Sequence, residues 1–421
     1  MFRPQLLTSL QGYSAAVFRA DLQAGISVAL VALPLSLAIA IASGAAPEQG
    51  LVTAIVAGFL ISALGGSHVQ VGGPTGAFIV VVAGVIAEHG YDGLVLATLM
   101  AGGILLVAGR LRLGSLIAHV PEAVINGFTI GIALIIAFSQ MKDLLGLRPV
   151  EDPADLVHKV PALWAARDTV NLSALGIGLL TMVLIVTFRR AAPRWPGLIV
   201  AVAIGSALVA VGGLQVETVA DRFGALTGKL PLPQLPSISV ARMQELFPSA
   251  LVIAFLAGVE SLLSAIVADR MTERRHKPNA ELVAQGTANL ASALFGGLPA
   301  TGAIARTATN IRAGGQTPVA GMVHALVIWA LMALAAPLAG AMAMPAMSAL
   351  LILTAWNMSE PHKWRGYMSA RHSDKVLLVL TLGLTVLVDL TVAIGTGVAL
   401  GLAFRLRRRQ APAQNWDPRD M

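Results

Sequence analysis

Long apolar runs separated by short polar segments dominate the chain. The first run, from Leu22 to Pro47, contains no charged residue and exceeds the roughly 20 residues that a helix needs to cross a bilayer. Runs of this kind predict seven membrane-spanning helices on each side of a polar, proline-containing segment near 214–246. The first seven are expected at 22–43, 50–65, 75–88, 92–109, 119–140, 172–188 and 196–213. The second seven are expected at 247–268, 280–295, 302–313, 317–336, 345–358, 375–389 and 391–405.

The basic residues give these helices an orientation. An odd number of spans in each half inverts the second half relative to the first, which makes an inverted repeat. With a cytoplasmic N-terminus, most of the 29 Lys and Arg residues fall on the cytoplasmic side. We therefore expect both termini in the cytoplasm and the long loops near 141–171 and 214–246 outside. The sequence predicts an all-α polytopic membrane protein with 14 transmembrane segments in a 7+7 inverted repeat.

Composition agrees with a membrane protein and excludes several other classes. Hydrophobic residues make up 56% of the chain and charged residues 12%, which is too little polar surface for a soluble globule of 421 residues. The net charge of +7 comes mainly from arginines in short loops between apolar runs, so no nucleic-acid partner is expected. There are no cysteines, the histidines lack metal-ligand spacing, and hydrolase and nucleotide-binding motifs are missing. We expect no metal, no cofactor and no enzymatic activity.

Two short segments interrupt apolar runs, one in each half of the chain. Residues 74–78 read Pro-Thr-Gly-Ala-Phe and residues 299–304 read Pro-Ala-Thr-Gly-Ala-Ile, each placing a Thr-Gly-Ala-apolar tetrad where a short helix could begin. Paired breaks are typical of inverted-repeat transporters, in which two half-helices meet near the bilayer midplane. Helix N-termini that face one cavity favour an anion. The alternative is that the tetrads recur by chance in a chain rich in Ala and Gly.

The two breaks supply the residues that we expect to bind the anion. Two glycines and a proline at 72–74 predict a strand-like entry into the first half-helix. The predicted binding residues are Thr75, Gly76, Ala77 and Phe78 in the first break and Thr301, Gly302, Ala303 and Ile304 in the second. Free backbone N–H groups are expected at the last three residues of each set.

Glu260 is an isolated carboxylate within an apolar run. No other charged residue occurs from Leu246 to Val259, and a carboxylate at that depth must be protonated, paired, or facing a water-filled cavity. Ser264 lies one turn later on the same helical face, so the two side chains are expected to hold the coupling ion, a proton or a sodium ion. The alternative is a protonated Glu260 that makes only structural hydrogen bonds between helices.

Arg306 follows Thr301 closely, on the tenth predicted span. Facing the site, it would raise the local potential for an anion or act as the counter-charge of Glu260. The alternative is that its side chain snorkels to the cytoplasmic surface beside Arg312. The sequence leaves these alternatives open.

These motifs resemble those of the sulfate permease (SulP) family of anion transporters over roughly residues 15–405. The matching segments are 19–25, 29–34, 70–78, 296–299 and 306–310. The resemblance implies that spans 1–4 and 8–11 form a mobile core, that spans 5–7 and 12–14 form a gate, and that substrate binds between spans 3 and 10. Residues 1–421 would form one transmembrane domain, with a first repeat over 15–213 and a second over 247–405.

The resemblance further implies a secondary active transporter of small anions, such as sulfate, bicarbonate or a dicarboxylate such as fumarate. The resemblance implies that the family's site positions correspond here to Phe78, Glu260, Ser264, Thr301, Gly302, Ala303 and Arg306. Sodium-coupled bicarbonate members tend to have Asp and Thr at the positions of Glu260 and Ser264, so proton-coupled symport by alternating access is expected. Many members have Ser where this chain has Ala305, which removes a hydroxyl from the expected anion site.

Other functions remain open on the same fold. They are sodium-coupled bicarbonate symport, anion exchange, an uncoupled anion channel and, on a similar architecture, nucleobase permeation. Most family members end in a cytoplasmic STAS domain; twelve residues follow Arg409 here, so no STAS domain is expected. The chain is expected to span the lipid bilayer of a bacterial inner membrane. A homodimer is one assembly that it could form.

Overall fold

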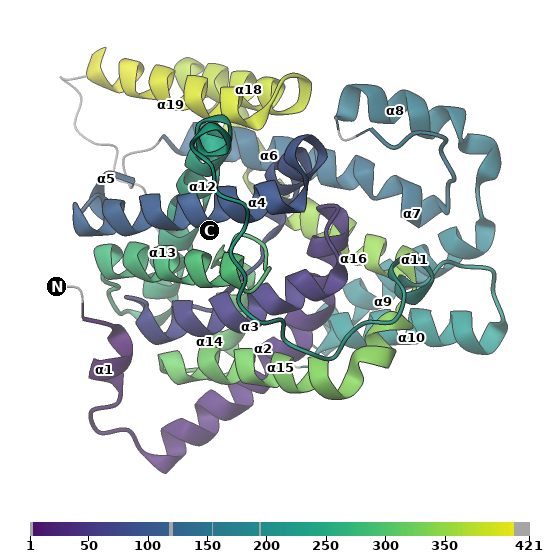
Figure 1. Cartoon of the computed structure of the whole chain (residues 1–421), viewed down its shortest axis with the longest axis horizontal. Helices are drawn as coiled ribbons and strands as arrows, with labels where there is room; N and C mark the ends of the chain where they lie inside the picture. Colours follow the sequence, from purple (N-terminus) through teal and green to yellow (C-terminus); the bar gives the residue numbers. More distant parts are fainter. Residues whose placement is uncertain (1–2, 118–120, 154, 193–194, 408–421) are drawn as a thin grey trace.

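The computed structural model describes residues 3–117, 121–153, 155–192 and 195–407, and these are almost entirely helical (Figure 1). Seven of its helical segments are long and apolar enough to cross a membrane. They are α2 (Ala15–Ala42), α3 (Pro47–Leu64), η1 (Gly76–Phe78) with α4 (Ile79–Arg110), α6 (Glu122–Ser139) with α7 (Met141–Leu145), α9 (Leu172–Ala191), α12 (Val240–Thr272) and α15 (Pro318–Gly340).

The other predicted spans also form helices. They are α10 (Gly197–Gly212), α13 (Pro278–Leu294), α14 (Ile304–Arg312), α16 (Met344–Met358), α18 (His372–Leu387) and α19 (Leu390–Arg407). The remaining short elements are α1 (Gln5–Ser9), α5 (Gly114–Ile117), α8 (Leu156–Ala165), η2 (Arg167–Thr169), α11 (Val219–Phe223), η3 (Pro361–Lys363) and α17 (Trp364–Ser369). The start of the span predicted at 119–140 lies partly outside the described residues.

Two predicted boundaries differ from the structure for local reasons. The third and fourth predicted spans are joined as α4, whose two parts meet at a kink at Gly90 instead of a loop. Gly90 has φ 69° and ψ 179°, a conformation that is open to glycine because it lacks a β-carbon. The eighth span begins at Val240, earlier than predicted, because the Ser239 side chain accepts a hydrogen bond from the N–H of Arg242 and caps α12.

The helices pack in two groups. In the first helix group, α2 packs against α3 and α15, α13 packs against α3 and α4, and α12 packs against α4 and α14. In the second helix group, α16 packs against α6 and α9, α9 packs against α10, and α18 packs against α6 and α19. Helices α10 and α16 also contact α2 and so join the two groups. Figure 1 shows α9 and α10 together at the right and α18 beside α19 at the top.

Glycines allow α4 and α13 to approach closely. A β-carbon on Gly102 would lie 2.9 Å from the carbonyl oxygen of Gly286, and one on Gly286 would lie 2.8 Å from the carbonyl oxygen of Gly102. Membrane helices commonly pack through small residues, because lipid tails provide no hydrophobic drive toward association. The contact between α4 and α13 therefore depends on the absence of side chains at these two positions.

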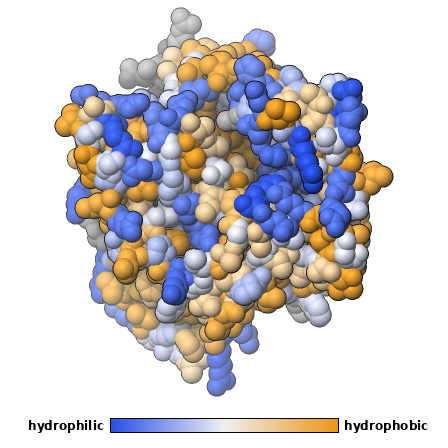
Figure 2. Space-filling model, turned by 45° about the vertical axis from the view of Figure 1, so that its right-hand side comes forward, coloured by the Kyte–Doolittle hydropathy of each residue, from blue (hydrophilic) through white to orange (hydrophobic). Residues whose placement is uncertain are grey.

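Apolar side chains cover much of the outer surface. Val211 on α10 is 89% exposed and Leu334 on α15 is 84% exposed. In the face shown in Figure 2, exposed hydrophobic side chains (orange) spread widely between hydrophilic ones (blue). Lipid acyl chains accommodate such a surface, whereas water does not. The fold is that of a polytopic membrane protein, as the sequence predicts.

Candidate functional site

The two predicted breaks lie side by side. Strand β1 (Gly72–Gly73) pairs antiparallel with β2 (Thr301–Gly302), so that Gly73 lies opposite Thr301. The chain then passes from β1 through an extended Thr75 into η1 and α4, and from β2 almost directly into α14. The predicted strand-like entry is confirmed, and the N-termini of two helices from opposite halves of the chain meet at this pair of strands.

The strand pair uses some backbone N–H groups that the sequence predicts to be free. The N–H of Ala303 donates to the carbonyl of Val71 (3.0 Å), and the N–H of Phe78 donates to the carbonyl of Thr75 (3.2 Å). The prediction of free donors at Ala303 and Phe78 is therefore wrong, because backbone pairing extends to Ala303 and the 3₁₀ turn closes on Phe78. In α14 the N–H of Thr307 bonds to Ala303, so the three preceding N–H groups have no partner within the helix.

Most of the predicted binding residues are buried against protein. Thr301 is fully buried and donates its hydroxyl to the carbonyl of Ala257 (2.9 Å), which holds β2 against α12. The side chain of Phe78 is 2% exposed, whereas Ile304 is 44% exposed. The other buried members of the set are Gly76, Ala77, Gly302 and Ala303, and Thr75 is half-buried.

Side chains of α13 hold the loop that enters β2. Asn289 is fully buried; its amide nitrogen donates to the carbonyl of Ala300 (2.9 Å) and its amide oxygen accepts from the N–H of Ala300 (2.8 Å). Ser292 donates to the carbonyl of Leu298 (2.7 Å), and Thr53 of α3 accepts from the N–H of Leu298 (2.6 Å). These bonds fix the second break, and sequence reasoning did not single out any of the three side chains.

Glu260 contacts the first break. The hydroxyl of Thr75 donates to Oε2 of Glu260 (2.8 Å), and both side chains are half-buried. Among the described residues, Glu260 forms no ion pair. Its carboxylate therefore contacts the first break, in the other half of the chain, through a single hydroxyl.

Ser264 is occupied elsewhere. Its hydroxyl lies 3.2 Å from the hydroxyl of Thr307, which in turn accepts from the N–H of Val71 (3.1 Å). Ser264 thus supports the strand pair through Thr307, and its hydrogen bond does not go to Glu260. The predicted joint ion site would require this bond to rearrange.

Arg306 is buried against the first break. It is 1% exposed, and its guanidinium donates to Ser36 Oγ (3.1 Å) and to the carbonyls of Pro74 (3.0 Å) and Gly72 (3.4 Å). Snorkelling to the surface is therefore wrong. A direct counter-charge role is also wrong, since no ion pair between Arg306 and Glu260 occurs in the described part of the chain. The guanidinium instead places a positive charge between α2, α14 and β1.

A fully buried carboxylate, Glu281 on α13, was not singled out from the sequence. It is fully buried; Oε1 accepts from the side chains of Gln70 (2.9 Å), Ser261 (3.0 Å) and Gln285 (3.0 Å), and Oε2 accepts from the N–H of Gly66 (2.9 Å). Every one of these partners is a donor, so both carboxylate oxygens of Glu281 have hydrogen-bond partners. The sequence feature that could have indicated Glu281 is a glutamate inside a predicted span with a glutamine one turn later.

The segment 19–25 also has a structural role. Asp21 is fully buried in the second turn of α2 and accepts from the N–H groups of Gln316 (2.7 Å) and Thr317 (3.1 Å), which immediately precede α15. The hydroxyl of Tyr13 also donates to Asp21 (2.9 Å). Burial, together with this contact to the carboxylate, raises the pKa of Tyr13 to about 12, so the phenol remains a donor at neutral pH. Asp21 thus fixes α2 against α15.

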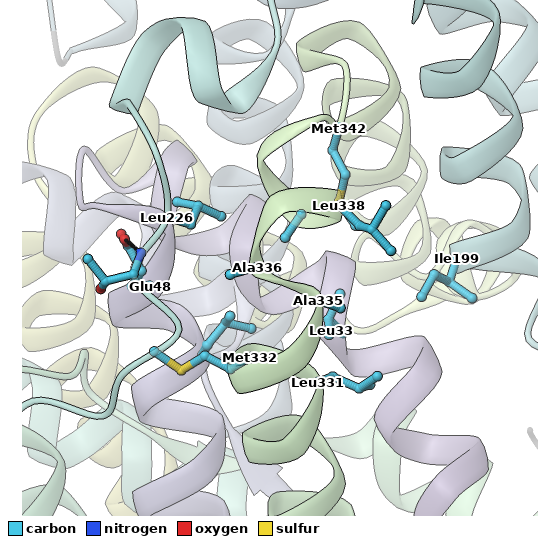
Figure 3. Close-up of a pocket in the computed structure, with 13 residues that line it drawn as sticks. Leu33, Glu48, Ile199, Leu226, Leu331, Met332, Ala335, Ala336, Leu338 and Met342 are labelled. Carbon is cyan, nitrogen blue, oxygen red and sulfur yellow. Dashed lines mark hydrogen bonds between the residues drawn. The ribbon is translucent and has the colours of Figure 1, made fainter.

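An apolar cavity lies apart from these residues (Figure 3). Its wall includes Leu33 of α2, Ile199 of α10 and Met332 of α15, with Glu48 at one side. None of the predicted binding residues lines it. A cavity lined mainly by alkyl groups, whose one charged group is a carboxylate, does not favour an anion, so the candidate site is the strand pair and its two helix N-termini.

Comparison with known proteins assigns the chain to a family. The family model named "Sulfate permease family" matches residues 18–381, which is most of the chain. The chain belongs to the sulfate permease family. This confirms the resemblance drawn from segments such as 70–78 and 306–310.

Relatives within the sulfate permease family are transporters. The chain is 42% identical to "Putative sulfate transporter YvdB" of Bacillus subtilis, over 94% of this chain and 75% of that protein. It is 31% identical to the bicarbonate transporter BicA of Picosynechococcus, over 93% of this chain and 70% of that protein. Anion transport across a membrane is thus the class of function, and the chain is no enzyme.

Solved structures of anion transporters share this fold. The transmembrane domain of a cyanobacterial bicarbonate transporter BicA matches with a TM-score of 0.80 at 29% identity, covering 91% of this chain and 99% of that one. Murine Slc26a9 in its inward-facing state matches with a TM-score of 0.87, covering 97% of this chain and 72% of that one. Its identity of 18% makes this a likeness of fold alone.

Proposed function

We propose that this member of the sulfate permease family is a secondary active transporter that carries a small anion by proton-coupled symport. The observation that carries the proposal is the pairing of β1 with β2, which joins two helix N-termini with the buried guanidinium of Arg306 beside them. Helix N-termini and a guanidinium favour negative charge at the same place. Sulfate, bicarbonate and a dicarboxylate such as fumarate are the candidate substrates, and the first two occur in the names of relatives.

The coupling role belongs to Glu260. While Glu260 is ionised, the hydroxyl of Thr75 donates its single hydrogen to the carboxylate and has none for an anion. Protonation of Glu260 releases that donor and removes a negative charge next to the site. Protonation and anion binding then favour each other by linkage, which is the thermodynamic requirement for symport.

Transport proceeds by alternating access in this proposal. The first helix group, which contains α12, α14 and both strands, is the mobile core, and the second helix group is the gate. Two inverted repeats of seven spans, over 15–213 and 247–405, generate this arrangement. Because the site residues lie in the first helix group, substrate moves with that group past the second.

Uptake into proteoliposomes tests the proposal. Radiolabelled sulfate, bicarbonate and fumarate are offered with and without an inward pH gradient, and at least one should accumulate only with the gradient. Glu260→Gln should abolish gradient-driven accumulation while exchange of internal for external anion persists. Glu48→Gln, a carboxylate in the wall of the apolar cavity, is the matched control and should behave like the wild type. Unchanged proton-driven uptake by Glu260→Gln would contradict the coupling assignment.

Sodium coupling is the second candidate, because Glu260 and Ser264 lie one turn apart on α12. Replacing the pH gradient by a sodium gradient distinguishes the two ions. Dependence on internal anion would favour an exchanger, and single-channel currents would favour an uncoupled channel. A homodimer is tested by the mass of the purified protein in detergent.

A further inference from the structure

Met358 of the second helix group lies directly over the first break. A β-carbon on Gly76 would lie 2.8 Å from Sδ of Met358 and 3.7 Å from Cδ1 of Ile136. Met358 is the last residue of α16, and Ile136 belongs to α6. Gly76 opens η1 in the first helix group and is buried. The two groups therefore touch where the first helix N-terminus begins.

The second break is not covered in this way. Ile304, the first residue of α14, is 44% exposed, and Ala305 is exposed as well. The start of α14 is thus accessible, whereas the start of η1 is closed by Met358 and Ile136. An anion at the start of η1 would therefore have to displace Met358 or Ile136, whereas the first residues of α14 are not covered in this way.

An anion that uses both N-termini must share space with the Met358 side chain. The thioether is a weak acceptor, so it is a poor substitute for an anion at the N–H groups that begin η1. Methionine has three rotatable bonds and fits irregular spaces, which allows the side chain to retract without backbone movement. The distance by which the Met358 side chain retracts sets the space available to an anion between the two breaks.

We propose that Met358 is a specificity-determining residue that limits the size of the anion admitted between the two breaks. The inference rests on the anion site proposed above and narrows its substrate class. Compact inorganic anions such as bicarbonate or sulfate fit beside Met358, and longer dicarboxylates are excluded by it. The gate thereby contributes to selectivity as well as to access.

A graded series of anions tests this size limit. Proteoliposome uptake of bicarbonate, sulfate, malonate and succinate is measured for the wild type, Met358→Ala and the control Met368→Ala, whose side chain on α17 is 74% exposed. Met358→Ala should raise succinate uptake relative to the preferred inorganic anion by about tenfold or more, since one methylene in an apolar pocket changes discrimination by roughly 10- to 200-fold. Met368→Ala should keep the wild-type ratio.

A double variant isolates the contact itself. Gly76→Ala should lower transport, because the new methyl group would occupy space that Sδ of Met358 and the anion must otherwise share. Gly76→Ala combined with Met358→Ala should recover transport, since the second change removes the clashing atom. A double variant as inactive as Gly76→Ala would overturn the proposed contact, provided both purify as folded protein by size exclusion.

Thiol labelling gives a readout that does not depend on flux. The chain has no cysteine, so Met358→Cys introduces a single thiol. Saturating sulfate or bicarbonate should slow its modification by an anionic methanethiosulfonate and leave Met368→Cys unaffected. The inference would be overturned if no transported anion changed the labelling rate at position 358.

The outcomes separate the two proposals. If the wild type transports anions but Met358→Ala keeps the wild-type selectivity, the size limit is wrong and the proposed function stands. If the wild type transports none of the anions and none protects the thiol, the proposed function fails and this inference fails with it.

Discussion

Replacement of Asn289 by leucine should lower stability strongly, although the two side chains have similar size. Asn289 supplies both a donor and an acceptor to the backbone of Ala300, and leucine supplies neither. Each buried backbone group left without a partner costs about 1–3 kcal/mol, so the loss is about 2–6 kcal/mol. That is a large part of a typical unfolding free energy of about 5–15 kcal/mol. Transport should fall as well, because β2 loses the anchor that precedes it.

The assay is thermal unfolding of the purified protein in detergent, followed by uptake at a temperature where the variant remains folded. Asn357→Leu is the matched control, because Asn357 is exposed at the end of α16. The reasoning is refuted if Asn289→Leu and Asn357→Leu unfold at the same temperature. It is also refuted if Asn289→Leu lowers the unfolding temperature but the variant still takes up anion at the wild-type rate.

Three further predictions concern buried contacts, one at the strand pair and two between helices. Arg306→Lys keeps the charge but cannot serve all of its acceptors with one ammonium, so uptake should fall and a carbonyl left unpaired should cost about 1–3 kcal/mol in thermal unfolding. Gly286→Val should separate α13 from α4 at Gly102 and cost about 1–3 kcal/mol by overpacking, measured the same way against an exposed Gly-to-Ala change. Asp21→Leu should expose the start of α15 to protease, since the N–H of Thr317 loses its acceptor; an unchanged digestion pattern would argue against that role.

The predicted spans agree with the structure because of a constraint that acts locally. A segment in a bilayer must satisfy its backbone hydrogen bonds within itself, so a sufficiently long apolar run becomes a helix whatever its neighbours are. Glycine and proline mark where this fails, as at Gly90 and residues 72–74. The positions of such interruptions could therefore be predicted from the sequence before any packing was known.

The partners of the charged residues could not be predicted in this way. The sequence left open whether Arg306 faces the anion site, pairs with Glu260 or reaches the surface, and the structure shows it at the carbonyls of the first break. Glu281 was not singled out from the sequence, yet it accepts four hydrogen bonds, two from the connection between α3 and β1, one from α12 and one from its own helix. These contacts join residues far apart in the sequence, and their geometry depends on how whole helices pack.

By itself the sequence determined the membrane environment, the helical spans and the two interruptions, since hydropathy and backbone conformation act over a few residues. Only the tertiary structure decided that β1 pairs with β2, that this pairing consumes the N–H of Ala303, and that Met358 covers Gly76. Each of these is a contact between segments brought together by packing, where a shift of a few tenths of an ångström changes which atoms meet. A one-dimensional pattern of polar and apolar positions does not encode distances of that kind.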